Sequence, residues 1–225
     1  MKIFTYLQYF FYLGFNWNFR IALKIINQEI KGEKKYNINT TGADELKKLS
    51  KNGIDISHAT IYMPISYLLL EEIFRQLPSR SKKHFLDIGC GKGRAVCVAA
   101  HQGYTKITGI DFSKQLCEDA LANLQNTKKE FPSIQYEIIT KDAIIFEIPA
   151  DVDCIFLFNP FDVVIMTALV SNIMGSVQEN SREIIVAYAN PLYENIFLEE
   201  GFIEIFHTQQ MKYLEAAILK LPALK

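Results

Sequence analysis

Residues 85–94 read FLDIGCGKGR and decide the fold of this chain. An apolar run of strand character carries one acid, Asp87, and ends in three glycines at alternate positions, Gly89, Gly91 and Gly93. A helical stretch, RAVCVAAH, follows at once, and the next apolar run, KITGI, is followed by a second acid, Asp111. This order of strand, glycine turn, helix, strand and acid is typical of a site for a nucleoside-bearing cofactor.

Each part of this layout has a physical reason. Glycine has no Cβ, so the turn can be tight and its backbone can approach a ligand closely. The turn presents backbone N–H groups at a helix N-terminus, where polar or anionic groups are held. An acid at the tip of the next strand can accept both hydroxyls of a ribose. We therefore expect binding at the carboxyl ends of the strands, with Asp111 on the sugar.

The spacing distinguishes between cofactors. A dinucleotide fingerprint requires glycine three positions after Gly91, where this chain has Arg94, which disfavours an NAD-type oxidoreductase. The pattern D-x-G-x-G-x-G instead resembles the first motif of class I S-adenosylmethionine (SAM) dependent methyltransferases, and the resemblance covers roughly residues 58–220. It implies SAM as the cofactor, held by the turn of Gly89, Cys90, Gly91 and Gly93. It also implies that Asp87 organises the methionine end of SAM.

Periodicity predicts alternating strands and helices after residue 58. Strands are expected at 84–89, 106–111, 134–140, 154–158, 183–189, 202–207 and 212–220. Helices are expected at 94–102, 113–129, 162–177 and 191–199, and at 59–77 with Leu68, Leu69, Ile73 and Leu77 on its inner face. Such alternation indicates a doubly wound parallel sheet. The last two strands have no helix between them and must pair as an antiparallel hairpin. The result is an α/β, Rossmann-like, seven-stranded sheet, which resembles the class I methyltransferase fold.

The resemblance assigns further cofactor contacts. Asp142 would accept a hydrogen bond from the adenine amino group, supported by the backbone of Ala143, and Phe112 would lie against the adenine or in the core. Tyr62 and Ser66 match a segment, Y-x-P-(S/T)-x-Y, of an uncharacterised bacterial methyltransferase group, in which it folds over the cofactor. The plainer alternatives are a helix-terminal acid at Asp111, a solvated turn at Asp142 and an ordinary helix start at Ser66.

Lys92 and Arg94 flank the glycine turn, and either could meet the SAM carboxylate. His58 and His84 are interpreted as structural.

Asn159, Pro160 and Phe161 follow the fourth strand and are the candidate catalytic residues. They resemble the Asn/Asp-Pro-Pro-aromatic motif of amino-group methyltransferases, with one proline missing. The Asn159 amide oxygen and the Pro160 carbonyl can accept two N–H bonds and aim the lone pair of a neutral amine for in-line displacement. Phe161 supplies an apolar wall.

Non-SET histone-lysine methyltransferases also place asparagine and phenylalanine at this point, so the acceptor is either a protein lysine or a small-molecule amine. The plainer alternative is a strand-to-helix turn with Asp162 as the cap. Tyr188, near the end of the fifth strand, is a further candidate to face the substrate.

Composition restricts the remaining possibilities. The net charge of −1 gives no support for nucleic acid as a partner. The four cysteines and four histidines show no metal-ligand spacing. The cysteines are expected to be reduced and to pack as small hydrophobic residues, which favours a cytoplasmic location.

The first 19 residues are unusual because they hold nine of the 28 aromatic residues, and residues 3–19 carry no charge. Residues 17–30 read as an amphipathic helix, and 31–57 as a polar linker with a short helix at 43–51. Residues 1–35 carry a net charge of +4. The segment could pack on the domain or on a partner subunit, or lie in a membrane interface through residues 1–30; its length argues against a spanning helix.

The chain is therefore expected to comprise an N-terminal helical extension and linker, 1–57, and a SAM-dependent methyltransferase domain, 58–225. The leading functional hypothesis is methyl transfer to an amino nitrogen. The alternatives are an O-methyltransferase and a SAM-binding, membrane-associated scaffold without catalysis.

Overall fold

A computed structural model describes residues 2–16, 18–41, 64–78, 83–158, 161–210 and 214–223. The helices are α1 (Lys2–Asn16), α2 (Phe19–Tyr36), α4 (Tyr67–Gln76), α5 (Arg94–His101), α6 (Lys114–Glu130), the 3-10 turn η1 (Ala143–Ile145), α7 (Val163–Glu179) and α8 (Glu194–Glu199). The strands are β1 (His84–Ile88), β2 (Lys106–Asp111), β3 (Gln135–Thr140), β4 (Cys154–Phe158), β5 (Ile184–Ala189), β6 (Ile203–Gln210) and β7 (Leu214–Leu221).

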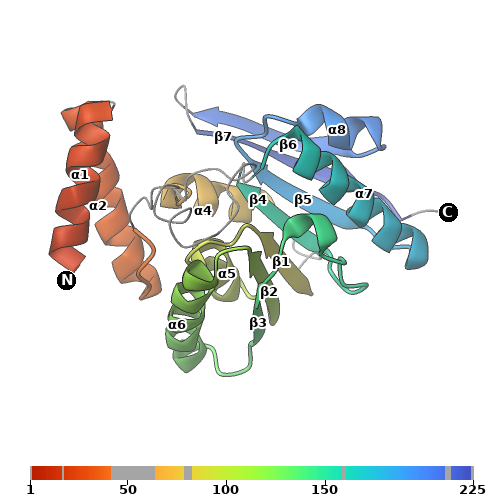
Figure 1. Cartoon of the computed structure of the whole chain (residues 1–225), viewed down its shortest axis with the longest axis horizontal. Coiled ribbons are helices and arrows are strands. Elements are labelled where there is room, and N and C mark those ends of the chain that lie inside the picture. The colour runs from red at the N-terminus through yellow and green to blue at the C-terminus, as the bar shows by residue number, and fades with distance from the viewer. Residues whose placement is uncertain are drawn as a thin grey trace.

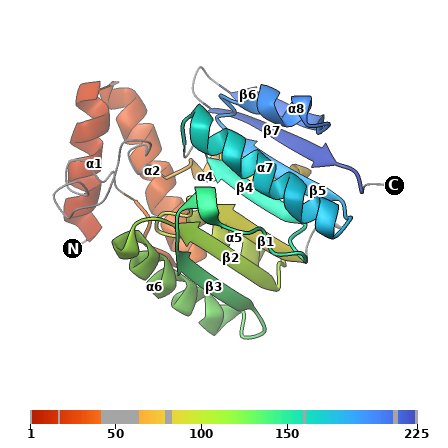
Figure 2. The same cartoon turned by 45° about the vertical axis from the view of Figure 1, so that its right-hand side comes forward.

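The strands form one seven-stranded sheet in the order β3-β2-β1-β4-β5-β7-β6 (Figures 1 and 2). The pairs among β1 to β5 are parallel, whereas β7 runs antiparallel to both β5 and β6. The predicted doubly wound sheet with its C-terminal antiparallel hairpin is confirmed. Strand order reverses between β1 and β4, and ligands of open α/β sheets bind at such a switch point, outside the carboxyl ends of the strands.

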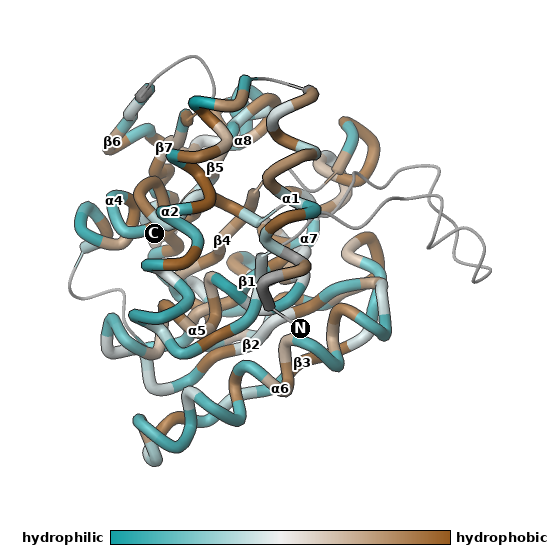
Figure 3. The backbone as a smooth tube through the Cα atoms, turned by 90° about the vertical axis from the view of Figure 1, so that its left-hand side faces the viewer, coloured by the Kyte–Doolittle hydropathy of each residue, from teal (hydrophilic) through white to brown (hydrophobic). Residues whose placement is uncertain are grey.

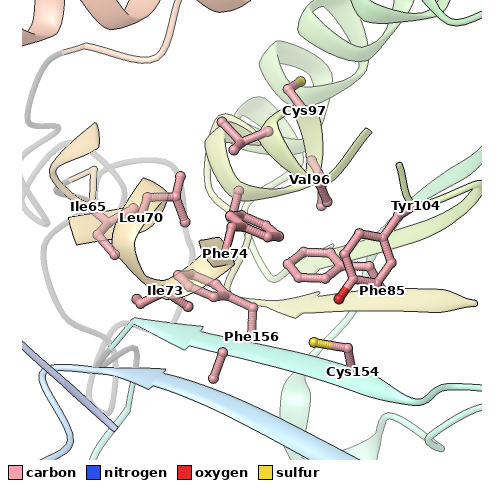
Figure 4. Close-up of a cluster of buried hydrophobic side chains, with 14 of the residues drawn as sticks. Ile65, Leu70, Ile73, Phe74, Phe85, Val96, Cys97, Tyr104, Cys154 and Phe156 are labelled. Atoms are coloured by element: carbon pink, nitrogen blue, oxygen red, sulfur yellow. The ribbon is translucent and has the colours of Figure 1, made fainter. Parts of the chain in front are cut away.

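Two apolar layers cover the two faces of the sheet. One layer combines β-strand side chains with residues of α4, α5 and α6 and with Tyr36 of α2; the other contains α7, Phe197 of α8 and Ala143 of η1. Figure 4 shows the first layer, where Phe74 of α4 faces Phe85 of β1 at a ring-centroid distance of 5.5 Å. Apolar side chains therefore bury both faces of the central strands, which accounts for their continuously apolar sequences.

Helix α4 corrects one detail of the sequence prediction. Leu69, Ile73 and Leu77 are buried as expected, but Leu68 is 45% exposed and Leu70 takes its place in the core. At about 100° per residue, Leu69, Leu70, Ile73, Phe74 and Leu77 share one arc of about 140° on the helix, and Leu68 lies outside it. The expected helix start, residues 59–63, lies outside the described residues.

The N-terminal segment forms a helical hairpin. Tyr9 and Leu13 of α1 pack with Ala22 of α2, and Figures 1 and 2 show α1 as the outer helix of the pair. Helix α2 continues to Tyr36, six residues beyond the predicted end at Ile30, so the polar run 31–36 is helix and not linker. The helix continues because Glu29, Gly32, Glu33 and Tyr36 form a second buried face. The expected helix at 43–51 lies outside the described residues.

Helix length bears on the membrane alternatives. Within the described ranges, no helix is both long and apolar enough to cross a bilayer.

Candidate active site

The glycine turn is fastened to the neighbouring strand. The backbone N–H groups of Gly89 and Cys90 both donate to the carbonyl of Ile110, at 2.9 and 2.8 Å. All three glycines have positive φ, 82°, 52° and 80° in order along the chain. At Gly93 a Cβ would also lie 3.0 Å from the Cβ of Ala120 in α6, so glycine is required there both by conformation and by space. The turn therefore forms a fixed loop between the tips of β1 and β2.

Asp111, predicted to hold the ribose, is buried at this point. Its Oδ2 accepts the N–H of Gly91 at 2.9 Å and its Oδ1 accepts the N–H of Ser113 at 2.9 Å. Burial raises the pKa of Asp111 to about 6, against the lowering effect of these two backbone hydrogen bonds. Each carboxylate oxygen keeps a second lone pair, so the group remains able to accept hydroxyl hydrogen bonds.

Asp87, predicted to organise the methionine end, lies in the centre of the sheet. It is 3% exposed and pairs in register with Gly109 of β2 and Phe156 of β4. Burial, and after it the nearby Asp111 carboxylate, raise the pKa of Asp87 well above its ordinary value. The site thus contains two buried carboxyl groups, and the charge of Asp111 disfavours the charged form of Asp87.

Cys90 lies in the same turn as a neutral thiol. Burial raises its pKa well above the ordinary value, and its Sγ donates to the carbonyl of Gly91 at 3.8 Å. A Cβ at Gly109 would come 3.0 Å from this Sγ, so the thiol packs closely under β2. All four cysteines are free and buried.

The residues predicted to hold the adenine follow the tips of β2 and β3. Phe112 is half-buried directly after Asp111, and the N–H of Lys141 donates to the carbonyl of Asp111 at 3.0 Å. Asp142 is exposed and its Oδ1 accepts the N–H of Ile144 at 2.9 Å, which begins η1, whereas Ala143 is buried. The chain thus brings Asp111, Phe112, Asp142 and Ala143 to one edge of the sheet.

The structure describes residues 64–78 of the segment before β1. Ser66 precedes α4, and its Oγ is buried without a hydrogen-bond partner in the described structure. An unpaired buried hydroxyl is costly, and a ligand group or water would satisfy it. The carbonyl of its neighbour Ile65 accepts from the guanidinium of Arg94, the residue that follows the glycine turn. Tyr62 lies outside the described residues.

Arg94 does not serve the cofactor as considered from sequence. Its guanidinium is 3% exposed and makes a paired contact with both carboxylate oxygens of Glu29 in α2, with Nη1 to Oε1 at 2.9 Å. Its Nε donates to Oγ1 of Thr40 at 2.8 Å, and its guanidinium carbon lies 4.0 Å from the centroid of the Tyr67 ring. The cation that follows Gly93 therefore joins the N-terminal hairpin to the glycine turn.

Sequence reasoning missed the polar residues that surround the Arg94–Glu29 pair. Glu33 of α2 accepts the N–H groups of Thr40 and Thr41, each at 2.6 Å. Asn123 of α6 donates to the carbonyls of Lys92 and Asn39, at 2.9 and 3.2 Å, and so ties the turn to the chain that follows α2. A usable signal was the spacing of Glu29, Gly32, Glu33 and Tyr36, which places all four on one helix face.

The tip of β4 carries the candidate catalytic turn. Leu157 of β4 pairs with Ile88 of β1, so the described end of β4 lies beside the strand that leads into the glycine turn. Asn159 and Pro160 lie outside the described residues. Phe161 is half-buried against the second core layer, and Asp162 caps α7 by accepting the N–H groups of Val164 and Ile165.

Tyr188, a further candidate to face the substrate, lies in the second core layer. It is completely buried in β5 and its ring packs against Phe197, with centroids 5.8 Å apart. His84 is structural, as expected, because its ring nitrogens contact Asp151 and Thr108. His58 lies outside the described residues.

Comparison with known proteins agrees with this geometry. Residues 79–220, more than half of the chain, match a family model described as a methyltransferase domain. The chain belongs to this methyltransferase family. It is an S-adenosylmethionine-dependent enzyme of the class I fold.

Solved structures resemble the methyltransferase in fold alone. The O-MT segment of StiE has 12% identity and a TM-score of 0.55, with 70% of this chain and 74% of that chain covered. The putative methyltransferase yhhF from Escherichia coli has 13% identity and a TM-score of 0.55, covering 71% and 88%. The N-methyltransferase NodS from Bradyrhizobium japonicum WM9 has 17% identity and a TM-score of 0.51, covering 68% and 94%. A search of curated protein sequences finds no significant match.

The residues of the methyltransferase site fit SAM. SAM carries positive charge on its sulfonium and ammonium groups, and when bound it supplies the methyl group. Two adjacent buried carboxyl groups, Asp87 and Asp111, are stabilised in their charged form by such a cation. The pyrophosphate of a dinucleotide would add negative charge to the same place. The charge of the site therefore favours SAM over NAD, independently of the glycine spacing.

A group with metal-ligand geometry lies elsewhere in the methyltransferase. Glu194, Glu204 and His207 bring one ligand atom each within 4.8 Å of one another, which no sequence spacing had indicated. His207 already pairs with Glu204 and Glu215, at 3.0 and 3.1 Å. The cluster belongs to α8 and β6, with Glu215 on β7, remote in the sheet order from the glycine turn between β1 and β2.

Proposed function

We propose that the enzyme transfers the methyl group of SAM to an amino nitrogen, either of a protein lysine or of a small-molecule amine. The proposal rests on the place where β4 ends in the sheet and on the sequence that follows it, Asn159, Pro160 and Phe161. They follow β4, whose Leu157 pairs with Ile88 immediately before the glycine turn. The acceptor would thus meet the cofactor at the switch point of the sheet.

The chemistry of these residues suits a neutral amine. SAM is already activated, so alignment supplies most of the catalysis. The Asn159 amide oxygen and the Pro160 carbonyl each accept an N–H bond, which leaves the lone pair of the nitrogen directed at the methyl group. The new C–N bond takes the nitrogen lone pair, the electrons of the C–S bond remain on sulfur, and the extra proton of the product is lost to solvent.

The cap of α7 supports a role for Asn159 other than starting that helix. Asp162 caps α7 through two backbone hydrogen bonds, 3.0 and 3.1 Å long. The helix start therefore has its cap at Asp162, and Asn159 is not required for that purpose. We further propose that Asp87, Gly89, Cys90, Gly91, Gly93, Asp111, Phe112, Asp142, Ala143, Tyr62 and Ser66 form the SAM site.

The chemical class of the acceptor is tested first. Purified enzyme is incubated with cell lysate and SAM carrying an isotopically enriched methyl carbon, and the labelled product is isolated. The carbon chemical shift distinguishes N–CH₃ from O–CH₃. We expect N–CH₃; an O–CH₃ signal would establish the O-methyltransferase alternative and refute the proposal.

The role of Asn159 is tested with the acceptor so identified. We expect Asn159→Ala to leave the Kd for SAM within about twofold and to lower kcat at least a hundredfold, since misalignment by about 1 Å costs a factor of that order. Asp162→Ala is the matched control: it removes the cap of α7, so thermal stability should fall while kcat changes little. Equal kcat in wild type and Asn159→Ala would refute the assignment.

A further inference from the structure

The outer surface of the N-terminal hairpin carries a continuous apolar patch. Phe4, Leu7, Phe11 and Phe15 of α1 are 65%, 50%, 48% and 77% exposed. At about 100° per residue these four side chains fall within about 80° of the helix circumference, opposite the buried Tyr9 and Leu13. In Figure 3 the tube of α1 is largely brown, the colour of hydrophobic residues. Monomeric soluble proteins rarely expose such a stripe without using it.

The patch continues from α1 onto α2. The ring of Phe15 lies 6.2 Å from that of Phe11 and 5.6 Å from that of Phe19, which is itself 44% exposed. Leu23, one turn further along α2, is 61% exposed, and Ile30 lies on the same stripe at 45%. The exposed apolar side chains of the two helices therefore form one surface.

The charges next to this surface have a single sign. Arg20, Lys24, Lys31 and Lys34 are exposed and follow the apolar stripe around α2. Residues 1–35 contain two acids, Glu29 and Glu33, and both are buried against the methyltransferase domain, at 3% and 2% exposure. Docking of α2 thus removes the acidic side chains from the hairpin surface and leaves its basic ones in solvent.

We propose that this face of the α1–α2 hairpin binds the surface of an anionic lipid membrane. Aromatic side chains partition into the headgroup boundary, and lysine and arginine beside them pair with anionic headgroups. Helix α1, at 15 residues, spans about 22 Å, short of the roughly 30 Å hydrocarbon core, so the hairpin lies in the interface. A second copy of this chain is disfavoured as the occupant, because a two-fold contact would bring the basic rims together.

Docking would also orient the enzyme. Arg94, which follows the glycine turn, pairs with Glu29 of α2, so a buried ion pair links the hairpin to that turn. A membrane bound to the outer face of the hairpin would therefore hold the carboxyl edge of the sheet at a fixed distance from lipid.

Vesicle sedimentation tests the proposal with the full chain. We expect binding to phosphatidylcholine vesicles containing one third phosphatidylserine, and at least tenfold weaker binding to pure phosphatidylcholine vesicles. Phe11→Ser with Phe15→Ser should weaken binding to the anionic vesicles at least tenfold. Arg20→Glu with Lys24→Glu should do the same without altering the core, because each basic side chain near the surface favours binding several-fold.

Leu192→Ser is the matched control, since Leu192 is equally exposed, at 61%, but lies after β5 and far from the hairpin in sequence. Its vesicle binding should equal that of wild type. Sedimentation velocity without lipid completes the test. No binding to anionic vesicles, or a dimer that the Phe11 and Phe15 changes convert to monomer while vesicle binding is unchanged, would overturn the proposal. Unchanged unfolding midpoints would establish that the variants are folded.

Discussion

Asp111 illustrates how one side chain can build a site and also serve it. Its carboxylate receives the N–H groups of Gly91 and Ser113, so it fixes both the glycine turn and the start of α6. Its burial raises its pKa to about 6. The ribose hydroxyls of SAM require an ionised acceptor for strong charge-assisted hydrogen bonds. Cofactor affinity should therefore depend on pH in the range where Asp111 titrates.

We expect the part of the SAM affinity that depends on Asp111 to be constant above about pH 7 and to fall as the pH drops below 6. A proton on Asp111 must be displaced for binding, so the limiting loss is about tenfold per pH unit. Isothermal calorimetry between pH 7.5 and 5 measures this change. In Asp111→Asn the affinity at pH 7.5 should be weaker by about tenfold or more, and the part of the pH dependence due to residue 111 should disappear. Equal pH profiles for wild type and variant would contradict the assignment.

Among the elements, α2 shows how close approach can outweigh helix propensity. Gly32 faces α4, where an added Cβ would lie 2.2 Å from the ring of Tyr67. That ring is stacked on Tyr36, with centroids 5.7 Å apart. Alanine is intrinsically favoured over glycine in a helix by about 1 kcal/mol, but this contact leaves no room for it.

We expect Gly32→Ala to lower the free energy of unfolding by about 1–3 kcal/mol, the usual range for overpacking a well-filled contact. Gly175→Ala in α7 is the matched control, because no atom lies within 4 Å of its added Cβ. That substitution should stabilise the protein by about 0.5–1 kcal/mol through helix propensity. Chemical denaturation measures both. If the two substitutions shift stability in the same direction, the close approach of α2 to α4 is not as described.

The elements also show what local sequence can predict. The strands from β1 to β5 were expected within one residue of their bounds; for β1, β4 and β5 the reason is that burial on both faces leaves a nearly continuous apolar run. The run KGEKKY was expected to be linker, yet it completes α2, because its Glu33 accepts the N–H groups of Thr40 and Thr41, and Glu29, one turn earlier, binds Arg94. Arg94 and Glu29 are 65 residues apart, and no periodicity predicts such a pair. The glycine turn could be predicted because its chemistry lies within ten consecutive residues.

For the whole molecule, the Arg94–Glu29 pair decides whether the hairpin and the sheet domain behave as one unit. Both side chains are almost completely buried, and the guanidinium is additionally bonded to Thr40 and the Ile65 carbonyl. Removing one member of a buried pair leaves an uncompensated charge and costs about 3–5 kcal/mol. The loss of stability should be greatest where α2 meets the glycine turn. It should extend to the cofactor site through Gly93, the residue before Arg94.

We expect Arg94→Met to lower the free energy of unfolding by about 3–5 kcal/mol and to weaken SAM binding, although Arg94 makes no contact assigned to the cofactor. Combining it with Glu29→Gln should cost less than the sum of the two single changes, because the double variant leaves no unpaired charge. Hydrogen exchange provides the spatial readout: amides of α1 and α2 should lose protection in Arg94→Met while those of β4 and β5 keep theirs. Additive losses, or uniform exchange across both parts, would mean that the pair does not couple the hairpin to the enzyme domain.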